Sequence, residues 1–170
     1  MKPFSFLFFF FLLGTAFLTG CGPMPSDAVK YNDSLIAIQD KVGERDDVFQ
    51  NSHDSTPEYI QACYNDLLGQ VNTSLTQTEK MGPLGDYDDF RKACLEFLGT
   101  YKGVIETEYK GIMDIVIKPD SLITVEEDSV NMELYDRAID KMDAAISKMV
   151  SVQEEFARKF NFQILNSEAE

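Results

Sequence analysis

The chain has 170 residues, of which 44% are hydrophobic and 26% charged, and its formal net charge is −14 at pH 7. This length suits a single domain with a sizeable core. So acidic a chain should be repelled by nucleic acid and by anionic lipid headgroups, so we expect no nucleic-acid partner. The charge favours solubility, with binding of a cation or a basic partner as the alternative.

The first twenty residues have the pattern of a cleaved secretory signal. Lys2 gives a basic start, residues 4–17 are almost wholly apolar, and Leu18-Thr19-Gly20-Cys21 follows. The apolar run is shorter than the ~20 residues that a spanning helix needs. A signal cut by a simple peptidase is the alternative. The lipobox-like residues instead predict a Cys21 that carries diacylglycerol and an acyl chain such as palmitate, which together anchor a protein stably.

The residues around the cleavage point also indicate a location. The residue after the lipidated cysteine is Gly22 and not Asp. By analogy with Gram-negative sorting, this favours the outer membrane of the cell envelope. Which face the protein occupies stays open. Residues 21–25 are expected to form a lipid anchor and a short, stiff tether.

Residues 26–170 predict an all-α domain. Apolar residues recur at steps of three and four, which is typical of amphipathic helices. Four helices are expected, over about 27–50, 57–81, 87–117 and 125–161. Because their connections are short, we expect an antiparallel up-down-up-down four-helix bundle after the cleaved signal peptide.

The first two helices have clear apolar stripes. A Thr56 N-cap and Pro57 in the first turn are expected to start the second helix, and residues 82–85 to end it. The stripe of the first is Tyr31, Leu35, Ile38, Val42, Arg45 and Phe49, and that of the second is Ile60, Tyr64, Leu67, Val71, Leu75 and Thr78.

The last two helices follow the same pattern. Asp86 is expected to cap the third, and Thr124 with Glu127 fits a capping box for the fourth. The third stripe is Phe90, Cys94, Phe97, Tyr101, Val104, Glu108, Ile112 and Ile115. The fourth is a heptad-like seam of Met132, Tyr135, Ile139, Met142, Ile146, Met149, Gln153, Phe156 and Phe160.

The order and spacing of several short motifs resemble a family of uncharacterised surface lipoproteins named for leptospiral members. The motifs are Tyr31-Asn32-Asp33, Phe90-Arg91-Lys92-Ala93, Phe97-Leu98-Gly99-Thr100-Tyr101-Lys102, Ile123-Thr124-Val125-Glu126-Glu127-Asp128 and residues 153–162. The resemblance implies a helical, envelope-facing domain. It implies no activity and no catalytic residues.

The sequence lacks the residues that most recognised catalytic, metal and cofactor sites require. The single histidine, His53, lies in a predicted loop, so the inward-facing Glu-x-x-His pairs of di-iron bundles cannot form. No zinc cluster, haem attachment motif, phosphate loop or calcium loop is present, so we expect no cofactor and no metal centre. No nucleophile–base pair is legible, so we do not expect an enzyme. Cys63 and Cys94 should stay unpaired, because their heights in the bundle differ by ~16 Å.

Three groups of side chains carry a second interpretation. Asp86, Asp88 and Asp89 are expected to form a helix N-terminus, or alternatively a cation site. Asp136, Asp140 and Asp143 are expected to form a solvated flank, or alternatively a cation site. Met132, Met142 and Met149 are expected to pack in the core, or alternatively to line a pocket for a soft metal or a hydrophobic ligand.

Two charges on the apolar stripes suggest a polar layer. Arg45 and Glu108 should sit at nearly the same height in the bundle, with Tyr64 and Tyr135 close to that level. The layer is expected to be a structural ion pair, or alternatively a small polar pocket.

We therefore expect an envelope-anchored, non-enzymatic binding or interaction module. It would be attached to the membrane by lipid and would meet an envelope protein partner. The alternative is a sensor for a small ligand or cation that uses the polar layer or the acidic flank.

Overall fold

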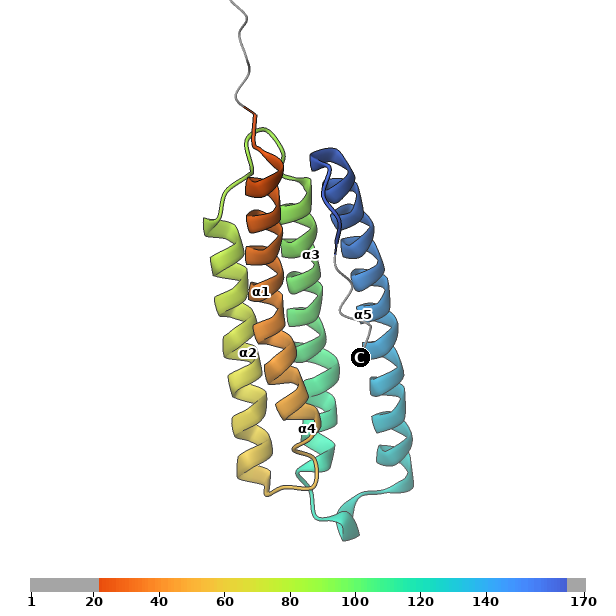
Figure 1. Cartoon of the computed structure of the whole chain (residues 1–170). Coiled ribbons are helices and arrows are strands. Elements are labelled where there is room, and N and C mark those ends of the chain that lie inside the picture. Colours follow the sequence, from red (N-terminus) through yellow and green to blue (C-terminus); the bar gives the residue numbers. More distant parts are fainter. Residues whose placement is uncertain (1–21, 165–170) are drawn as a thin grey trace, which may run out of the picture.

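The computed structural model describes residues 22–164. The predicted signal peptide, the predicted lipidation site Cys21 and residues 165–170 lie outside the described residues. The described chain is all-helical and has four long helical segments, as expected (Figure 1). Its elements are α1 (Pro25–Gln50), α2 (Pro57–Lys80), α3 (Asp89–Val104), the π-helical η1 (Ile105–Tyr109), α4 (Lys110–Val116), the 3-10 turn η2 (Asp120–Leu122) and α5 (Val125–Phe160).

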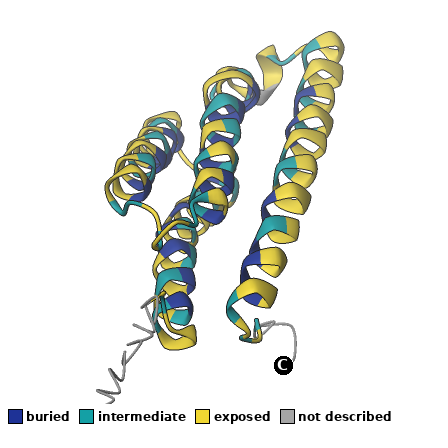
Figure 2. Ribbon diagram, turned by 90° about the horizontal axis from the view of Figure 1, so that it is seen from above, coloured by how far each residue is buried: buried dark blue, intermediate teal, exposed yellow. Residues whose placement is uncertain are grey.

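The helices pack in chain order. The closest pairings are α1 with α2, α2 with α3, and α3 with α5, whereas α1 and α5 touch much less. Buried residues lie on the facing sides of the helices and exposed residues on the outward sides (Figure 2). The weak α1–α5 pairing leaves one side of the assembly less tightly closed than the others. Within residues 22–164, no helix is long and apolar enough to cross a membrane.

The local signals at the starts of α2 and α5 and at the end of α2 are confirmed. The Thr56 hydroxyl accepts a bond from the Tyr59 backbone N–H at 3.4 Å at the start of α2. At the start of α5, Thr124 and Glu127 form the expected capping box, with N···O distances of 3.0 and 3.1 Å. Gly82 has a φ of 69°, a left-handed backbone that suits glycine at the end of α2.

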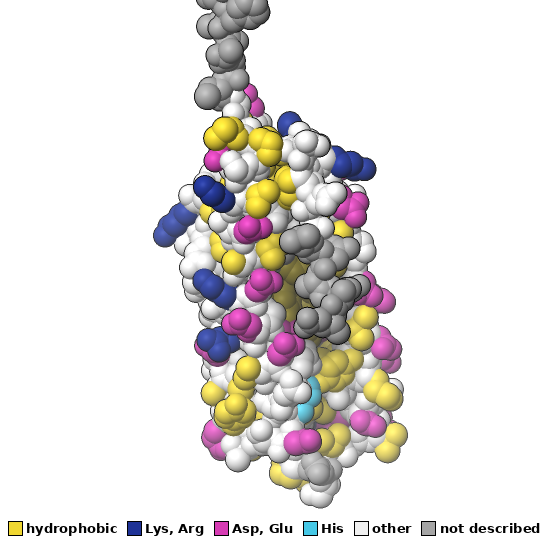
Figure 3. Space-filling view, in the orientation of Figure 1, with side chains coloured by type: hydrophobic (Ala, Val, Ile, Leu, Met, Phe, Trp, Pro, Cys, Tyr) yellow, Lys and Arg dark blue, Asp and Glu magenta, His cyan; other side chains and the backbone are white. Residues whose placement is uncertain are grey.

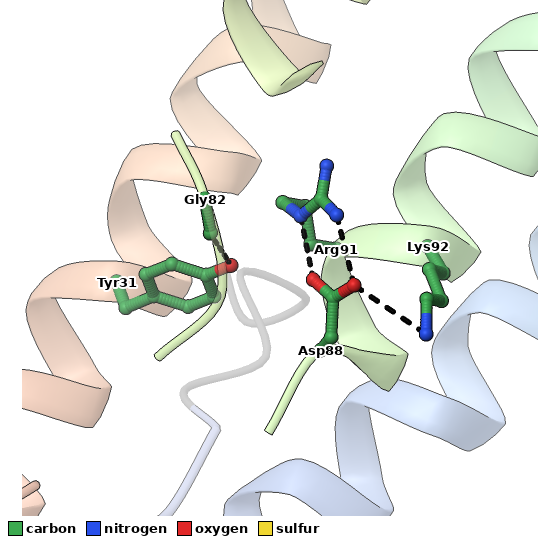
Figure 4. Close-up of polar contacts among 5 residues, drawn as sticks. All are labelled: Tyr31, Gly82, Asp88, Arg91 and Lys92. Atoms are coloured by element: carbon green, nitrogen blue, oxygen red, sulfur yellow. Dashed lines mark hydrogen bonds and ion pairs between the residues drawn. The ribbon is translucent and has the colours of Figure 1, made fainter. Parts of the chain in front are cut away.

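The start of α3 differs from the expectation. Its N-cap is Asp88 and not Asp86, and the helix begins at Asp89. The Asp88 carboxylate makes no cap bond, because it binds the Arg91 guanidinium through two contacts of 2.6 and 2.8 Å and lies 3.4 Å from Lys92 Nζ (Figure 4). The turn before it is held by Tyr31, whose hydroxyl donates to the Gly82 carbonyl at 2.7 Å.

An aromatic cluster closes the end of the bundle where α1 begins and α5 ends. Phe156 is at its centre and is fully buried, with Phe90 stacked on it at 5.2 Å between ring centroids. Tyr87 stacks on the same ring at 5.3 Å, and Lys159 Nζ lies 4.4 Å above the Tyr87 ring. This cluster joins α3 and α5 firmly at one end.

The third predicted helix runs without a break from Asp89 to Val116, but it is not a regular α-helix throughout. A π-helical segment, η1, separates α3 from α4, and it contains the buried residues Ile105, Glu108 and Tyr109. Just beyond it, Gly111 meets α5 so closely that an added Cβ would lie 2.8 Å from Leu134 Cδ1. The change of helical period alters which side chains face α5.

The seam predicted for α5 is correct only towards its C-terminal end. Met149, Gln153 and Phe156 are buried, but Met132, Ile139 and Ile146 are exposed by 58%, 55% and 42%. The prediction that these three residues pack in the core is wrong. Their stripe lies on the side of α5 that α1 covers poorly. The apolar spacing is present in α5, but no neighbouring helix packs closely enough to bury it.

The two cysteines of the helical domain are free, as predicted. Both Cys63 and Cys94 are buried. Burial raises the pKa of the Cys94 thiol to about 12, although the Gln39 amide, 3.1 Å away, acts in the opposite direction. Cys94 is therefore a small buried core residue and not a reactive thiol.

Candidate functional site

The polar layer predicted from the sequence does not form. Arg45 lies on the surface and its Nε is 3.2 Å from Asp66 on α2. Glu108 is 4% exposed, but its partners are Lys141 at 2.8 Å and Arg137 at 3.8 Å, both on α5. The predicted pairing of Arg45 with Glu108 is therefore wrong.

The reason lies in the phase of α1. Between the buried Val42 and Phe49, a helix allows an inward residue at position 45 or at position 46, because steps of three-then-four and four-then-three are both helical. The sequence interpretation placed Arg45 inward. In the structure Asp46 is the half-buried residue and Arg45 is exposed.

The two tyrosines of the predicted layer lie apart. Tyr64 is buried against Phe49, with 6.1 Å between ring centroids. Tyr135 reaches the loop after α1, where its hydroxyl lies 2.9 Å from Nδ1 of His53. Burial lowers the pKa of His53, so the neutral imidazole is favoured as the partner of this hydroxyl.

The structure instead forms a groove along the poorly packed side of the bundle. It has a volume of about 430 Å³, which is in the range of small-molecule sites. We call it the α1–α5 groove. It is lined by Asp46, Gln50, Phe97, Tyr101, Tyr109, Tyr135, Ala138, Ile139, Met142, Asp143 and Ile146.

One wall of the α1–α5 groove is apolar and belongs to α5. Ile139, Met142 and Ile146 follow one another at helical spacing, and Phe97 of α3 faces the same space. Hydrophobic side chains gather over the lower half of α5 with acidic ones among them, whereas the Lys and Arg side chains visible in this view lie along the opposite edge and at the top (Figure 3).

The floor of the groove is polar. Tyr101, Tyr109 and Gln50 lie around Asp46 in the groove lining, and the Gln50 Nε2 to Asp46 Oδ1 distance is 3.4 Å. Burial raises the pKa of Asp46, and these hydrogen-bonding groups only partly offset the rise. Burial and the nearby Asp46 charge raise the pKa of both tyrosines, which therefore stay protonated as donors.

The π-helical segment places Tyr109 on this floor. At about 100° per residue, eight residues of regular α-helix would put Tyr109 about 80° around the axis from Tyr101. The wider π-turn holds about one more residue, which takes back about 100°. Tyr101 and Tyr109 consequently line the same groove as Asp46. π-helical insertions of this kind are frequent at functional sites.

The other candidates from the sequence do not assemble into sites. Arg91 and Lys92 occupy the Asp88 carboxylate, which leaves the residue 86–89 segment as a helix start. Asp136 and Asp140 are exposed and do not line the groove, whereas Asp143 does. Among the described residues, no three His, Cys, Asp or Glu side chains are grouped so that they could hold a metal ion.

The methionine stripe divides in three ways. Met132 is exposed, Met142 is half-buried in the groove and Met149 is buried in the core. Only Met142 therefore agrees with the pocket interpretation, and Met149 with core packing.

Sequence reasoning missed Asp46, Gln50 and Tyr109 as site residues. Asp46 was missed because Arg45 fits the helical spacing between Val42 and Phe49 equally well. Tyr109 was missed because the π-helical segment changes the helical period before it. No local signal in the sequence specifies the π-helical segment, so Tyr109 could not be found from the apolar period alone.

Comparison with known proteins gives no relative for this chain: no family model, no curated protein and no solved structure matches it. The α1–α5 groove and the residues that form it are therefore the basis on which a function is assigned.

Proposed function

We propose that the protein is a lipid-anchored, non-enzymatic binding module of the bacterial cell envelope. The anchor would be Cys21, and the outer membrane of a Gram-negative bacterium the location. The motif Leu18-Thr19-Gly20-Cys21 after a short apolar run supports this, as does the Gly22-Pro23-Met24-Pro25 tether that leads directly into α1.

The helices would form an antiparallel up-down-up-down bundle. The chain path in Figure 1 and the contacts between consecutive helices support this topology. A bundle whose first and last helices pack weakly offers a binding site between them.

One observation carries the binding role. The residues that the heptad-like seam of α5 marks for a core, Ile139 and Ile146 above all, are exposed beside a groove with a polar floor. Apolar surface left uncovered in this way is typical of a ligand site.

A neutral, environment-sensitive hydrophobic dye tests this role. It should bind the unlipidated mature chain and lose most of its affinity in Ile146→Glu, because Ile146 lines the groove. Val150→Glu is the matched control, since Val150 lies one turn along α5, is 38% exposed and does not line the groove. Equal loss in both variants, or no dye binding at all, would refute a binding role for the groove.

The anchor has its own test. Replacing Cys21 with Ala should release the protein into the soluble fraction or leave it unprocessed. A mature N-terminus that mass spectrometry finds unmodified in the native protein would overturn lipidation.

A protein partner in the envelope is the second candidate. Exposed apolar side chains continue along α5 beyond the groove at Val125, Val130 and Met132. A partner held by this surface should be lost from pull-downs with Val130→Glu but kept with Ile146→Glu.

A further inference from the structure

We infer that the α1–α5 groove binds an organic cation, namely an ammonium group attached to an apolar body of small-molecule size. This inference rests on the proposed binding role of the groove and names the chemical class of its ligand. The ammonium group would lie against Asp46, and the apolar body along the α5 wall.

The first support is the state of Asp46. Its side chain is half-buried in the groove floor, yet within residues 22–164 it takes part in no ion pair. Arg45, its neighbour in the chain, faces away and is paired with Asp66. A half-buried carboxylate without a cationic partner loses part of its hydration, and a bound cation would compensate for that loss.

The second support is the charge balance of the lining. Two carboxylates, Asp46 and Asp143, face the groove, and none of its lining residues is basic. An anionic ligand would meet these charges and the overall charge of −14, and would be repelled. A neutral ligand would leave Asp46 uncompensated. Only a cation complements both carboxylates.

The third support is the aromatic content. Phe97, Tyr101, Tyr109 and Tyr135 all contribute to the lining, so the carboxylates stand among aromatic side chains. Aromatic faces attract an ammonium group through their π-electrons and tolerate the methyl or methylene groups that it carries. A bare metal ion would not use these faces, and Ca²⁺ would require six to eight oxygen ligands.

The fourth support is size and shape. A volume of about 430 Å³ exceeds what a single ammonium ion fills. The rest of the space is bounded by Ile139, Met142 and Ile146, which would cover an alkyl or aryl body. The ligand is therefore amphipathic, with one cationic end.

The test compares three compounds that share one phenylbutyl body and differ only in the head group: 4-phenylbutylammonium, 4-phenylbutanol and 5-phenylvalerate. Binding to the whole mature chain, unlipidated through Cys21→Ser, is measured by calorimetry at 0.15 M salt. The ammonium compound should bind about tenfold more tightly than the alcohol, and the carboxylate most weakly.

Two variants locate the effect. Asp46→Asn should remove the advantage of the ammonium compound while the affinity for the alcohol stays within about twofold. Asp40→Asn makes the same change of charge on an exposed position of α1 outside the groove, and should leave the advantage intact. Asp46→Asn removes an unpaired charge, so it should fold, which its melting temperature checks.

The outcomes separate the two proposals. Equal binding of the ammonium compound and the alcohol, with the neutral dye still bound at Ile146, would overturn the cation assignment and keep the binding role. The same loss in Asp40→Asn and Asp46→Asn would also overturn it, because a diffuse negative field would then be the cause. Failure of the dye and of all three compounds would overturn both.

Discussion

Lys141 on α5 binds the buried carboxylate of Glu108 in the π-helical segment, and we predict that this ion pair stabilises the packing of α5. The Lys141 Nζ lies 2.8 Å from Glu108 Oε1, and the two side chains are 48% and 6% exposed. Because about half of Lys141 stays in solvent, the coupling should be ~1 kcal/mol, well below the 3–5 kcal/mol lost when a fully buried pair is broken.

The assay is a double-mutant cycle with Glu108→Gln and Lys141→Met, followed by denaturant unfolding. A coupling of ~1 kcal/mol corresponds to a shift of roughly 2–4 °C in Tm for a domain of this size. The matched control is the cycle of Arg45→Met with Asp66→Asn, whose side chains are 46% and 61% exposed and should couple by less than ~0.5 kcal/mol. Additive effects of the Glu108 and Lys141 variants would refute the reasoning.

The same pair should appear in the pH dependence of stability. Burial raises the pKa of Glu108, but hydrogen bonds from Lys141 and Thr107 outweigh it and leave the pKa below its ordinary value of 4.5. A pKa that is lower in the folded state gives stability that is present above pH 4.5 and is lost as the pH falls through the folded pKa. Glu108→Gln should remove this part of the acid sensitivity.

Three further predictions follow from single contacts. Asp46→Asn should raise the free energy of unfolding at pH 7, because burial raises the pKa of Asp46; the gain should shrink as the pH falls and the native carboxyl takes up a proton. Gly111→Ala should destabilise by ~1–2 kcal/mol through its contact with Leu134, whereas Gly99→Ala, which has no neighbour within 4 Å, should stabilise by up to ~1 kcal/mol. Thiol labelling without reductant should find both cysteines of the helical domain free, but only after unfolding.

The helices and most of their ends could be predicted because their determinants are local. A Thr56 hydroxyl, a following proline or the Thr124–Glu127 capping box acts within one turn, so the sequence alone contains the whole interaction. Asp88 shows where this fails. It caps α3 only by position, because Arg91 and Lys92 compete for its carboxylate more strongly than the backbone does.

The groove could not be predicted because its determinants are long-range. Apolar periodicity identifies the face of α5 that contains Ile139 and Ile146, but burial of that face depends on how closely α1 approaches it. The same holds for which of Arg45 and Asp46 faces inward, because both fit the helical spacing and only the packing of α1 decides between them. The η1 segment added a change of period that no local signal specified.

Three departures from ideal helical packing meet at the α1–α5 groove: the π-helical segment that carries Tyr109, the unpaired carboxylate of Asp46 and the uncovered apolar stripe of α5. Each is unfavourable in the free protein, and a Leu at position 46 or polar residues at 139 and 146 would relieve two of them. Such conflicts between local rules and the fold are expected at functional sites, where the ligand supplies the missing interactions. An ammonium group at Asp46 and an apolar body on α5 would satisfy two of the departures at once, while the third places Tyr109 in the groove lining. The aromatic cluster around Phe156, which shows none of these conflicts, fixes the C-terminal end of α5 against α3.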